Sequence, residues 1–165
     1  MAIVTLKGNE IETFGPLPEV GTKSPDFTLV KQNLSEVTLQ DFAGKRIILN
    51  IFPSLDTGTC AASVRTFNQK AASLYNTEVL CVSGDLPFAA SRFCVAEDIK
   101  GVETASSFRN SEFGTDYGVQ FQTGPLKGLL ARSIVVVDTQ GKVIYNELVS
   151  ETINEPNYEA AIAVL

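Results

Sequence analysis

The chain has 165 residues, a formal net charge of −6 and no block of Lys and Arg, so nucleic acid and anionic membrane surfaces are poor candidates for partners. It has no histidine, which excludes Cys-His and Ser-His-Asp catalytic sites and every zinc site that requires histidine. The length predicts one domain over residues 1–165.

The start of the sequence does not resemble a targeting signal. Residues 1–8 lack the basic segment and the long apolar segment of a secretory signal. No apolar run approaches the roughly 20 residues that a membrane helix needs. We therefore expect a cytoplasmic protein without membrane contact, and leave a periplasmic one open because a removed leader would leave no trace.

The first third of the chain predicts short strands. Residues 2–7 and 10–14 flank Gly8-Asn9 and predict a β-hairpin at the N-terminus. Two further short strands are expected near 27–30 and 37–39, where apolar and β-branched residues lie between turn-forming segments.

The middle of the chain predicts a βαβ unit. The near-continuous apolar run 46–52 is typical of a central strand that is covered on both faces. A helical pattern over 59–75 and a second apolar strand at 78–83 follow it. Two strands joined through a helix in this way run parallel.

The second half of the chain continues the alternation of helices and strands. Asp85 and Pro87 mark the start of a helix that runs to about residue 97. A strand is expected over 102–108 and a short helix over 111–117.

The C-terminal part predicts an antiparallel hairpin and a closing helix. Residues 133–138 and 143–145 flank the turn of the hairpin, and a helix is expected over 154–164. Together with the βαβ unit, these elements predict an α/β fold in which a mixed central sheet is flanked by helices.

Cys60 lies at the start of a predicted helix. This helix follows the strand 46–52 and a turn that contains Pro53 and Gly58. A helix N-terminus carries partial positive charge and unpaired N–H groups that stabilise a thiolate. Thr57 can also direct its hydroxyl at a sulfur three residues later, which favours a reactive thiol. A small buried hydrophobe is the alternative, since free cysteines are commonly buried.

Ionisation of the thiol alone increases its reactivity only modestly. A free thiol with a pKa of about 8.5 is roughly 3% ionised at neutral pH, so full ionisation raises the nucleophile's population only about 30-fold. Fast cleavage of a peroxide also needs donors aimed at the charge that develops on the leaving oxygen. Without histidine, Arg and Thr are the candidates. Arg132 directly precedes the strand 133–138 and its guanidinium can serve two acceptors; a solvated surface arginine is the alternative.

We expect different roles for the other two cysteines, Cys94 and Cys81. Cys94 lies on a helix, either as a half-buried residue or as a resolving thiol for Cys60, which is too distant in sequence for a CxxC switch. Cα atoms more than about 7 Å apart cannot be bridged by a disulfide, so pairing of residues on two different helices can require rearrangement. Cys81 lies inside an apolar strand and is expected to be inert. The cysteine spacings resemble no compact zinc pattern, so neither a metal nor another cofactor is expected.

The pattern Pro53-x-x-x-Thr57-x-x-Cys60 resembles the active-site motif of the peroxiredoxins. The longer segment 50–65 is similar to the bacterial thiol peroxidase (Tpx) subfamily, of the atypical two-cysteine type. The similarity extends over essentially the whole chain. It includes segments 85–94, 108–113 and 124–132, which are more specific in combination than the short motif.

This resemblance implies a thioredoxin-like fold with an added N-terminal β-hairpin. Cys60 matches the peroxidatic cysteine and Cys94 the resolving cysteine of the same subunit. Thr57 and Arg132 match the residues that hydrogen-bond the thiolate and the peroxide, and Pro53 matches the proline that shields the thiolate. The family reduces hydrogen peroxide and organic hydroperoxides, is recycled by thioredoxin, serves antioxidant defence and usually forms homodimers.

Two other functions fit part of the pattern. A general dithiol oxidoreductase of thioredoxin-like fold normally needs CxxC at the start of the helix, whereas residues 60–63 read Cys-Ala-Ala-Ser. A non-enzymatic redox sensor, which changes partner when a disulfide forms, stays open as an additional role.

Overall fold

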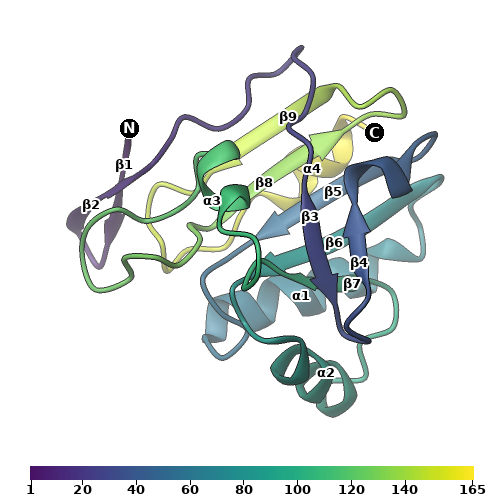
Figure 1. Cartoon of the computed structure of the whole chain (residues 1–165), viewed down its shortest axis with the longest axis horizontal. Helices are drawn as coiled ribbons and strands as arrows, with labels where there is room; N and C mark the ends of the chain where they lie inside the picture. The colour runs from purple at the N-terminus through teal and green to yellow at the C-terminus, as the bar shows by residue number, and fades with distance from the viewer.

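A seven-stranded mixed sheet lies at the centre of the computed structural model, which describes residues 1–165 (Figure 1). Its strands are β3 (Thr28–Lys31), β4 (Glu36–Thr38), β5 (Arg46–Ile51), β6 (Thr77–Ser83), β7 (Glu103–Ser106), β8 (Ser133–Val137) and β9 (Val143–Leu148). Their order across the sheet is β4-β3-β7-β6-β5-β8-β9. β5 pairs in parallel with β6 and antiparallel with β8, so the expected mixed sheet is confirmed.

The apolar run of β5 explains its inner position. Residues from Ile47 to Ile51 are all buried. Ile47, Leu49 and Ile51 join the core on one face of the sheet, and Ile48 joins the core on the other. Successive side chains of a strand point to opposite faces, so an apolar run interrupted only by Asn50 fits a strand that is covered on both sides.

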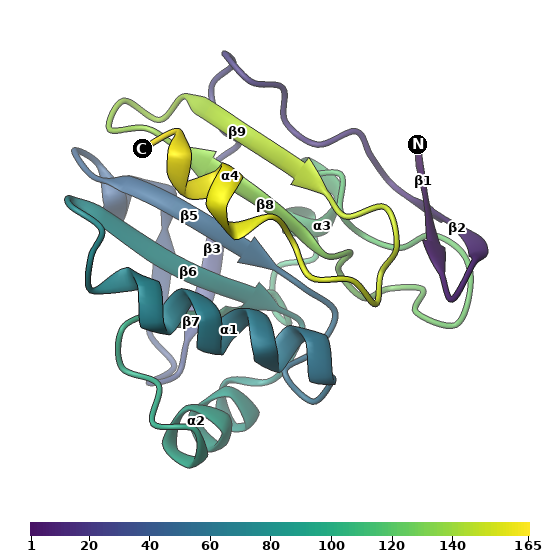
Figure 2. The ribbon, with the colours of Figure 1, turned by 180° about the vertical axis from the view of Figure 1, so that it is seen from behind.

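Helices cover one face of the sheet, as Figure 2 shows for α1 (Gly58–Ala71) and α4 (Tyr158–Ala163). α2 (Pro87–Ala96) lies beyond α1 and contributes to the same core. Val64, Phe67, Phe93 and Ala161 pack there against Ile48. This core also contains all three cysteines.

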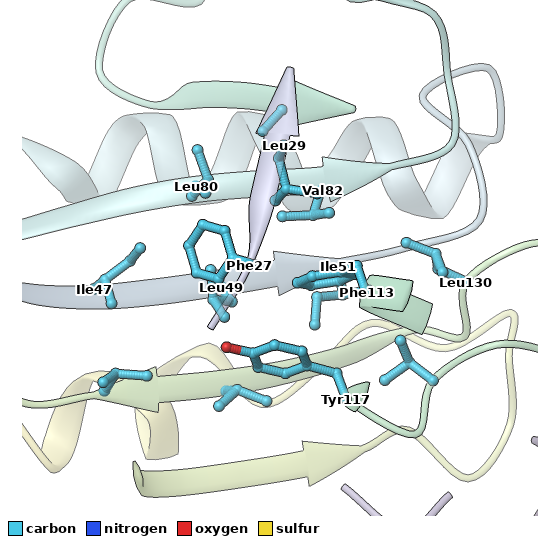
Figure 3. Close-up of a cluster of buried hydrophobic side chains, with 14 of the residues drawn as sticks. Phe27, Leu29, Ile47, Leu49, Ile51, Leu80, Val82, Phe113, Tyr117 and Leu130 are labelled. Atoms are coloured by element: carbon cyan, nitrogen blue, oxygen red, sulfur yellow. The ribbon is translucent and has the colours of Figure 1, made fainter. Parts of the chain in front are cut away.

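The other face is covered by aromatic residues around the short helix α3 (Glu112–Asp116), shown in Figure 3. The ring of Phe113 stacks on Tyr117 with centroids 4.5 Å apart and meets Phe27 edge to face at 6.0 Å. The Tyr117 hydroxyl donates to the Pro25 carbonyl at 2.7 Å and lies 2.8 Å from the hydroxyl of Ser24. Burial raises the pKa of Tyr117.

The N-terminal hairpin, β1 (Ala2–Leu6) and β2 (Asn9–Thr13), forms a separate antiparallel sheet. Its buried side chains, Val4 and Ile11, pack against Phe121 and Ala131. The expected hairpin is therefore confirmed, and it rests on the segment that directly precedes Arg132.

Two helix boundaries differ from the sequence prediction. α1 ends at Ala71 instead of residue 75, because the Ser73 backbone N–H and hydroxyl both bond the Lys70 carbonyl and form a turn. α4 begins at Tyr158 instead of residue 154, since the Asn157 side chain caps it by accepting from the N–H of Ala160 at 3.0 Å. None of the helices is long and apolar enough to cross a membrane.

Candidate active site

Cys60 lies in the first helical turn of α1, which follows β5 through a short connecting segment. Thr57 is the N-cap of the helix, with an extended backbone. The Cys60 side chain has no exposed surface. Its sulfur accepts a hydrogen bond from Nη1 of Arg132 at 3.3 Å. The sulfur thus lies at the N-terminal end of a helix and in contact with a guanidinium.

Arg132 is a buried cation, with 3% of its surface exposed, and not the solvated arginine left open by the sequence. Its Nε donates to the Thr152 carbonyl at 2.9 Å and its Nη1 donates to Cys60. No carboxylate lies within 4.0 Å of its guanidinium nitrogens. A buried charge is costly unless it is paired and hydrogen-bonded. Among the groups that Arg132 touches, the Cys60 sulfur is the one that can become an anion.

Thr57 and Pro53 both lie in the turn between β5 and α1. The Thr57 hydroxyl is not directed at the Cys60 sulfur, contrary to the sequence-based expectation. It donates instead to the Ser54 carbonyl at 3.0 Å, and the Thr57 N–H bonds the same carbonyl at 3.2 Å. Thr57 therefore closes the turn in this structure. Pro53 is buried directly after Phe52.

Residues 151–153, here called the strap, connect Arg132 to the rest of the site. The Thr152 carbonyl accepts from Arg132, and the Ile153 carbonyl accepts from the Thr59 hydroxyl at 2.8 Å. The strap therefore holds both the guanidinium and the first turn of α1. Sequence reasoning missed it because the contacts use backbone carbonyls, which every residue carries.

Glu151 joins the strap to the N-terminal hairpin. Its carboxylate accepts from the Thr5 hydroxyl at 2.6 Å, the Lys7 N–H at 2.8 Å and the Gly8 N–H at 3.0 Å. The hydrogen bond from Thr5, followed by those from the backbone of Gly8 and Lys7, lowers the pKa of Glu151 to about 2. Backbone bonds run in parallel with it, from the Thr5 N–H to the Ser150 carbonyl at 2.7 Å and from the Thr152 N–H to the Thr5 carbonyl at 2.8 Å. The hairpin thus reaches the site through the Glu151 carboxylate and these backbone bonds.

Cys94 lies on α2 and is 6% exposed. Its sulfur accepts from Nε2 of Gln32 at 3.4 Å, and the same nitrogen donates to the Thr104 hydroxyl at 2.9 Å. Burial raises the pKa of the Cys94 thiol. Cys60 and Cys94 share one buried cluster and both are free thiols. No sequence signal pointed to Gln32, which lies in a distant turn.

Cys81 lies in β6, where it pairs with Asn50 of β5 and is 1% exposed. Burial raises the pKa of Cys81 to about 12, so the thiol stays protonated. Nδ2 of Asn50 lies 3.6 Å from the Cys81 sulfur and donates to the Ser63 hydroxyl at 3.1 Å. That hydroxyl donates to the Cys60 carbonyl at 2.7 Å. Cys81 therefore packs beside a polar chain that supports α1.

Comparison with known proteins identifies the family. The family described as Redoxin matches residues 19–162. The thiol peroxidase of Corynebacterium glutamicum is 56% identical over 165 residues, which cover all of this chain and 99% of that protein. The chain belongs to the thiol peroxidases of the redoxin family. The expectation of a thiol peroxidase enzyme from the resemblance is thereby confirmed.

Solved structures of the family have the same fold. A peroxiredoxin-like protein from Aquifex aeolicus is 38% identical with a TM-score of 0.92, over 98% of this chain and 94% of that one. The thiol peroxidase from Chromobacterium violaceum has a TM-score of 0.89 at 21% identity, over 96% of this chain and 91% of that one. The thioredoxin-like peroxiredoxin fold with its N-terminal hairpin is therefore confirmed.

Replacing Glu151 by Gln tests the junction of strap and hairpin. A carboxyl whose pKa is lowered by folding stabilises the protein above its unfolded pKa, about 4.3, and this contribution is lost as the pH falls toward its folded pKa. For Glu151 that folded pKa is about 2. We expect Glu151→Gln to melt below wild type near neutral pH, and the difference in Tm to shrink as the pH falls from about 6 to about 3.

Circular dichroism melts at several pH values measure this difference. Glu36→Gln is the matched control, since the Glu36 side chain is exposed on β4 and makes no hydrogen bond; it should melt like wild type throughout. A Tm difference for Glu151→Gln that does not change with pH would contradict the role of the carboxylate charge.

Proposed function

We propose that this peroxidase reduces hydrogen peroxide and organic hydroperoxides with Cys60 as the peroxidatic thiol, Cys94 as the resolving thiol and thioredoxin as the reductant. The observation that carries the proposal is the buried sulfur of Cys60 beside the guanidinium of Arg132, which has no carboxylate partner. A cation placed in this way stabilises negative charge both on the sulfur and on an oxygen that departs next to it.

In the first step the Cys60 thiolate attacks the terminal oxygen of the hydroperoxide. The S–O bond forms, the O–O bond breaks, and the sulfur becomes a sulfenic acid. The leaving alkoxide or hydroxide takes up the proton that the thiol had lost, giving an alcohol or water. Arg132 and the N–H groups at the start of α1 stabilise the departing oxygen. Thr57 joins them when its hydroxyl turns from the Ser54 carbonyl toward the peroxide, and Pro53 shields the thiolate from water.

In the second step the Cys94 thiol attacks the sulfenic sulfur. The S–S bond forms, the S–O bond breaks, and water leaves. Cys94 must first leave the buried cluster and the amide of Gln32, so α2 has to open locally. Its outer surface is already solvated, with Phe88 67% exposed and Val95 80% exposed. A segment with this little burial opens at low cost compared with the core of the sheet.

In the third step two thiols of thioredoxin reduce the disulfide by exchange through a mixed disulfide. Cys60 and Cys94 return as thiols and thioredoxin leaves oxidised, so each cycle transfers two electrons to one peroxide. A homodimer and a role in antioxidant defence complete the proposal, both supported by the family resemblance alone, together with the cytoplasmic location expected from the sequence.

Replacing each cysteine by serine tests the assignment in a thioredoxin-coupled assay of peroxide consumption. Cys60→Ser should abolish consumption, because the nucleophile is lost. Cys94→Ser should react with about one equivalent of peroxide and then fail to cycle with thioredoxin. Cys81→Ser should cycle like wild type, since that thiol is protonated and takes no part.

Mass spectrometry after one equivalent of peroxide checks the same scheme. It should show a link between Cys60 and Cys94. Near-normal activity of Cys60→Ser, or a link between Cys60 and Cys81, would overturn the assignment. A protein that forms the disulfide but does not consume many equivalents of peroxide with thioredoxin present would be a sensor.

Replacing Arg132 by Lys keeps the charge but removes the planar set of donors. Because Nε holds the strap while Nη1 holds the sulfur, one ammonium group cannot serve both acceptors in this geometry. We expect the rate of Cys60 oxidation by peroxide to fall at least about tenfold, measured by rapid quenching and mass spectrometry.

Arg46→Lys is the matched control for Arg132→Lys. The Arg46 guanidinium also donates to a backbone carbonyl, that of Tyr75, but it lies at the start of β5, at the opposite end of the strand from Cys60. In Arg46→Lys, peroxide should oxidise Cys60 at the same rate as in wild type. An unchanged rate in Arg132→Lys would remove Arg132 from the mechanism.

A further inference from the structure

Asp85 connects the two segments that carry Cys60 and Cys94. It follows β6 and precedes α2, which carries Cys94. Its side chain does not cap α2, whose N-cap is Leu86, although its position in the sequence predicted a helix start. The carboxylate is directed instead at the turn before Cys60.

Three hydrogen bonds, here called the Asp85 latch, converge on this carboxylate. Oδ1 accepts from the Ser54 hydroxyl at 2.8 Å. Oδ2 accepts from the Leu55 N–H and from the Ser83 hydroxyl, both at 2.7 Å. No cation lies within 4.0 Å of the carboxylate, so these three donors stabilise its charge.

The arrangement of the sheet makes the latch possible. β5 and β6 run in parallel, so their C-terminal ends lie at the same edge of the sheet (Figure 2). The turn toward Cys60 leaves the end of β5, and the connection to α2 leaves the end of β6. Two other contacts join the same segments, the ion pairs Arg92–Asp56 at 3.3 Å and Arg65–Glu97 at 3.4 Å.

The latch is the strongest of these three links. All four side chains of the two ion pairs are at least 38% exposed, and exposed pairs contribute little to stability. Hydrogen bonds to a charged group that is partly shielded from water are stronger than neutral ones. Ser83 and Leu55 are each 4% exposed, whereas Ser54 and Asp85 are half-buried, so two of the three donors of the latch are largely desolvated.

We propose that Asp85 is a positioning residue that sets how readily the Cys60 turn and α2 separate after Cys60 has been oxidised. This proposal rests on the function proposed above. With the latch closed, Cys60 stays beside Arg132 and reacts with peroxide. With the latch open, Cys94 reaches the sulfenic acid.

The latch thereby decides between two fates of the sulfenic acid. Attack by Cys94 forms the disulfide and releases water. Attack of the sulfenate on a second hydroperoxide breaks another O–O bond and gives a sulfinic acid and an alcohol. The first reaction depends on opening and the second on peroxide concentration, so a weaker latch protects Cys60 from overoxidation.

The test compares Asp85→Ala and Asp85→Asn with wild type by rapid quenching and mass spectrometry. With limiting peroxide, the rate of Cys60 oxidation should fall and the rate of disulfide formation should rise, each by about tenfold or more, the factor that corresponds to one charge-assisted hydrogen bond. The peroxide concentration that converts half of Cys60 to sulfinic acid should rise by about the same factor. Asp85→Asn, which keeps part of the acceptor set, should lie between Asp85→Ala and wild type.

Asp138→Ala is the matched control. Asp138 also accepts two backbone N–H bonds in a turn, from Gln140 at 2.8 Å and Lys142 at 2.9 Å, but it follows the end of β8, which is antiparallel to β5. Loss of that carboxylate should lower Tm and leave both rates and the sulfinic acid threshold unchanged. A merely structural role for Asp85 would give the same result as Asp138→Ala.

The outcomes separate the latch from the proposed function. An unchanged or lowered sulfinic acid threshold in Asp85→Ala overturns the latch. If circular dichroism shows that Asp85→Ala is unfolded, Ser54→Ala, which removes one donor, decides by the same measurement with a smaller expected rise. A wild-type protein that forms no Cys60–Cys94 disulfide with one equivalent of peroxide overturns both proposals, and is recognised before any variant is compared.

Discussion

The contact between the buried guanidinium of Arg132 and the sulfur of Cys60 is the interaction on which the rest of the site depends. A cation without a carboxylate partner in the core is costly, so it needs rigid support. That support comes from β8, from the carbonyl of Thr152, and from the hairpin that Glu151 joins to the strap. The N-terminal hairpin therefore supports the candidate active site as well as the fold.

The proposed mechanism requires opposite properties of the two cysteines. In it Cys60 stays fixed beside Arg132, whereas Cys94 leaves its buried position so that a disulfide forms. The fold separates these needs by placing one on the long helix against the sheet and the other on a helix whose outer surface is exposed. Asp85 lies between them, and its carboxylate links the rigid part to the part that opens.

The features that could be predicted from the sequence are those that residues close together in the chain determine. The apolar run of β5, the turn with Pro53 and the start of α1 all carry their signal within a few residues, and the family motif added the remaining site residues. Contacts between distant segments were not predictable. Gln32 beside Cys94 and the Thr152 carbonyl beside Arg132 depend on how the sheet is ordered. The Thr57 hydroxyl was expected to be directed at the sulfur, but it donates to a backbone carbonyl in its own turn.

In the proposed mechanism Arg132 stabilises the oxygen that leaves as well as the sulfur that attacks. Alkylation of Cys60 by iodoacetamide needs only the thiolate, whereas reaction with peroxide needs both effects. The most direct measurement compares the two rates in Arg132→Met and wild type at one pH. We expect the rate of reaction with peroxide to fall at least about tenfold more than the rate of alkylation. An equal fall in both rates would contradict it, because Arg132 would then act on the thiolate alone.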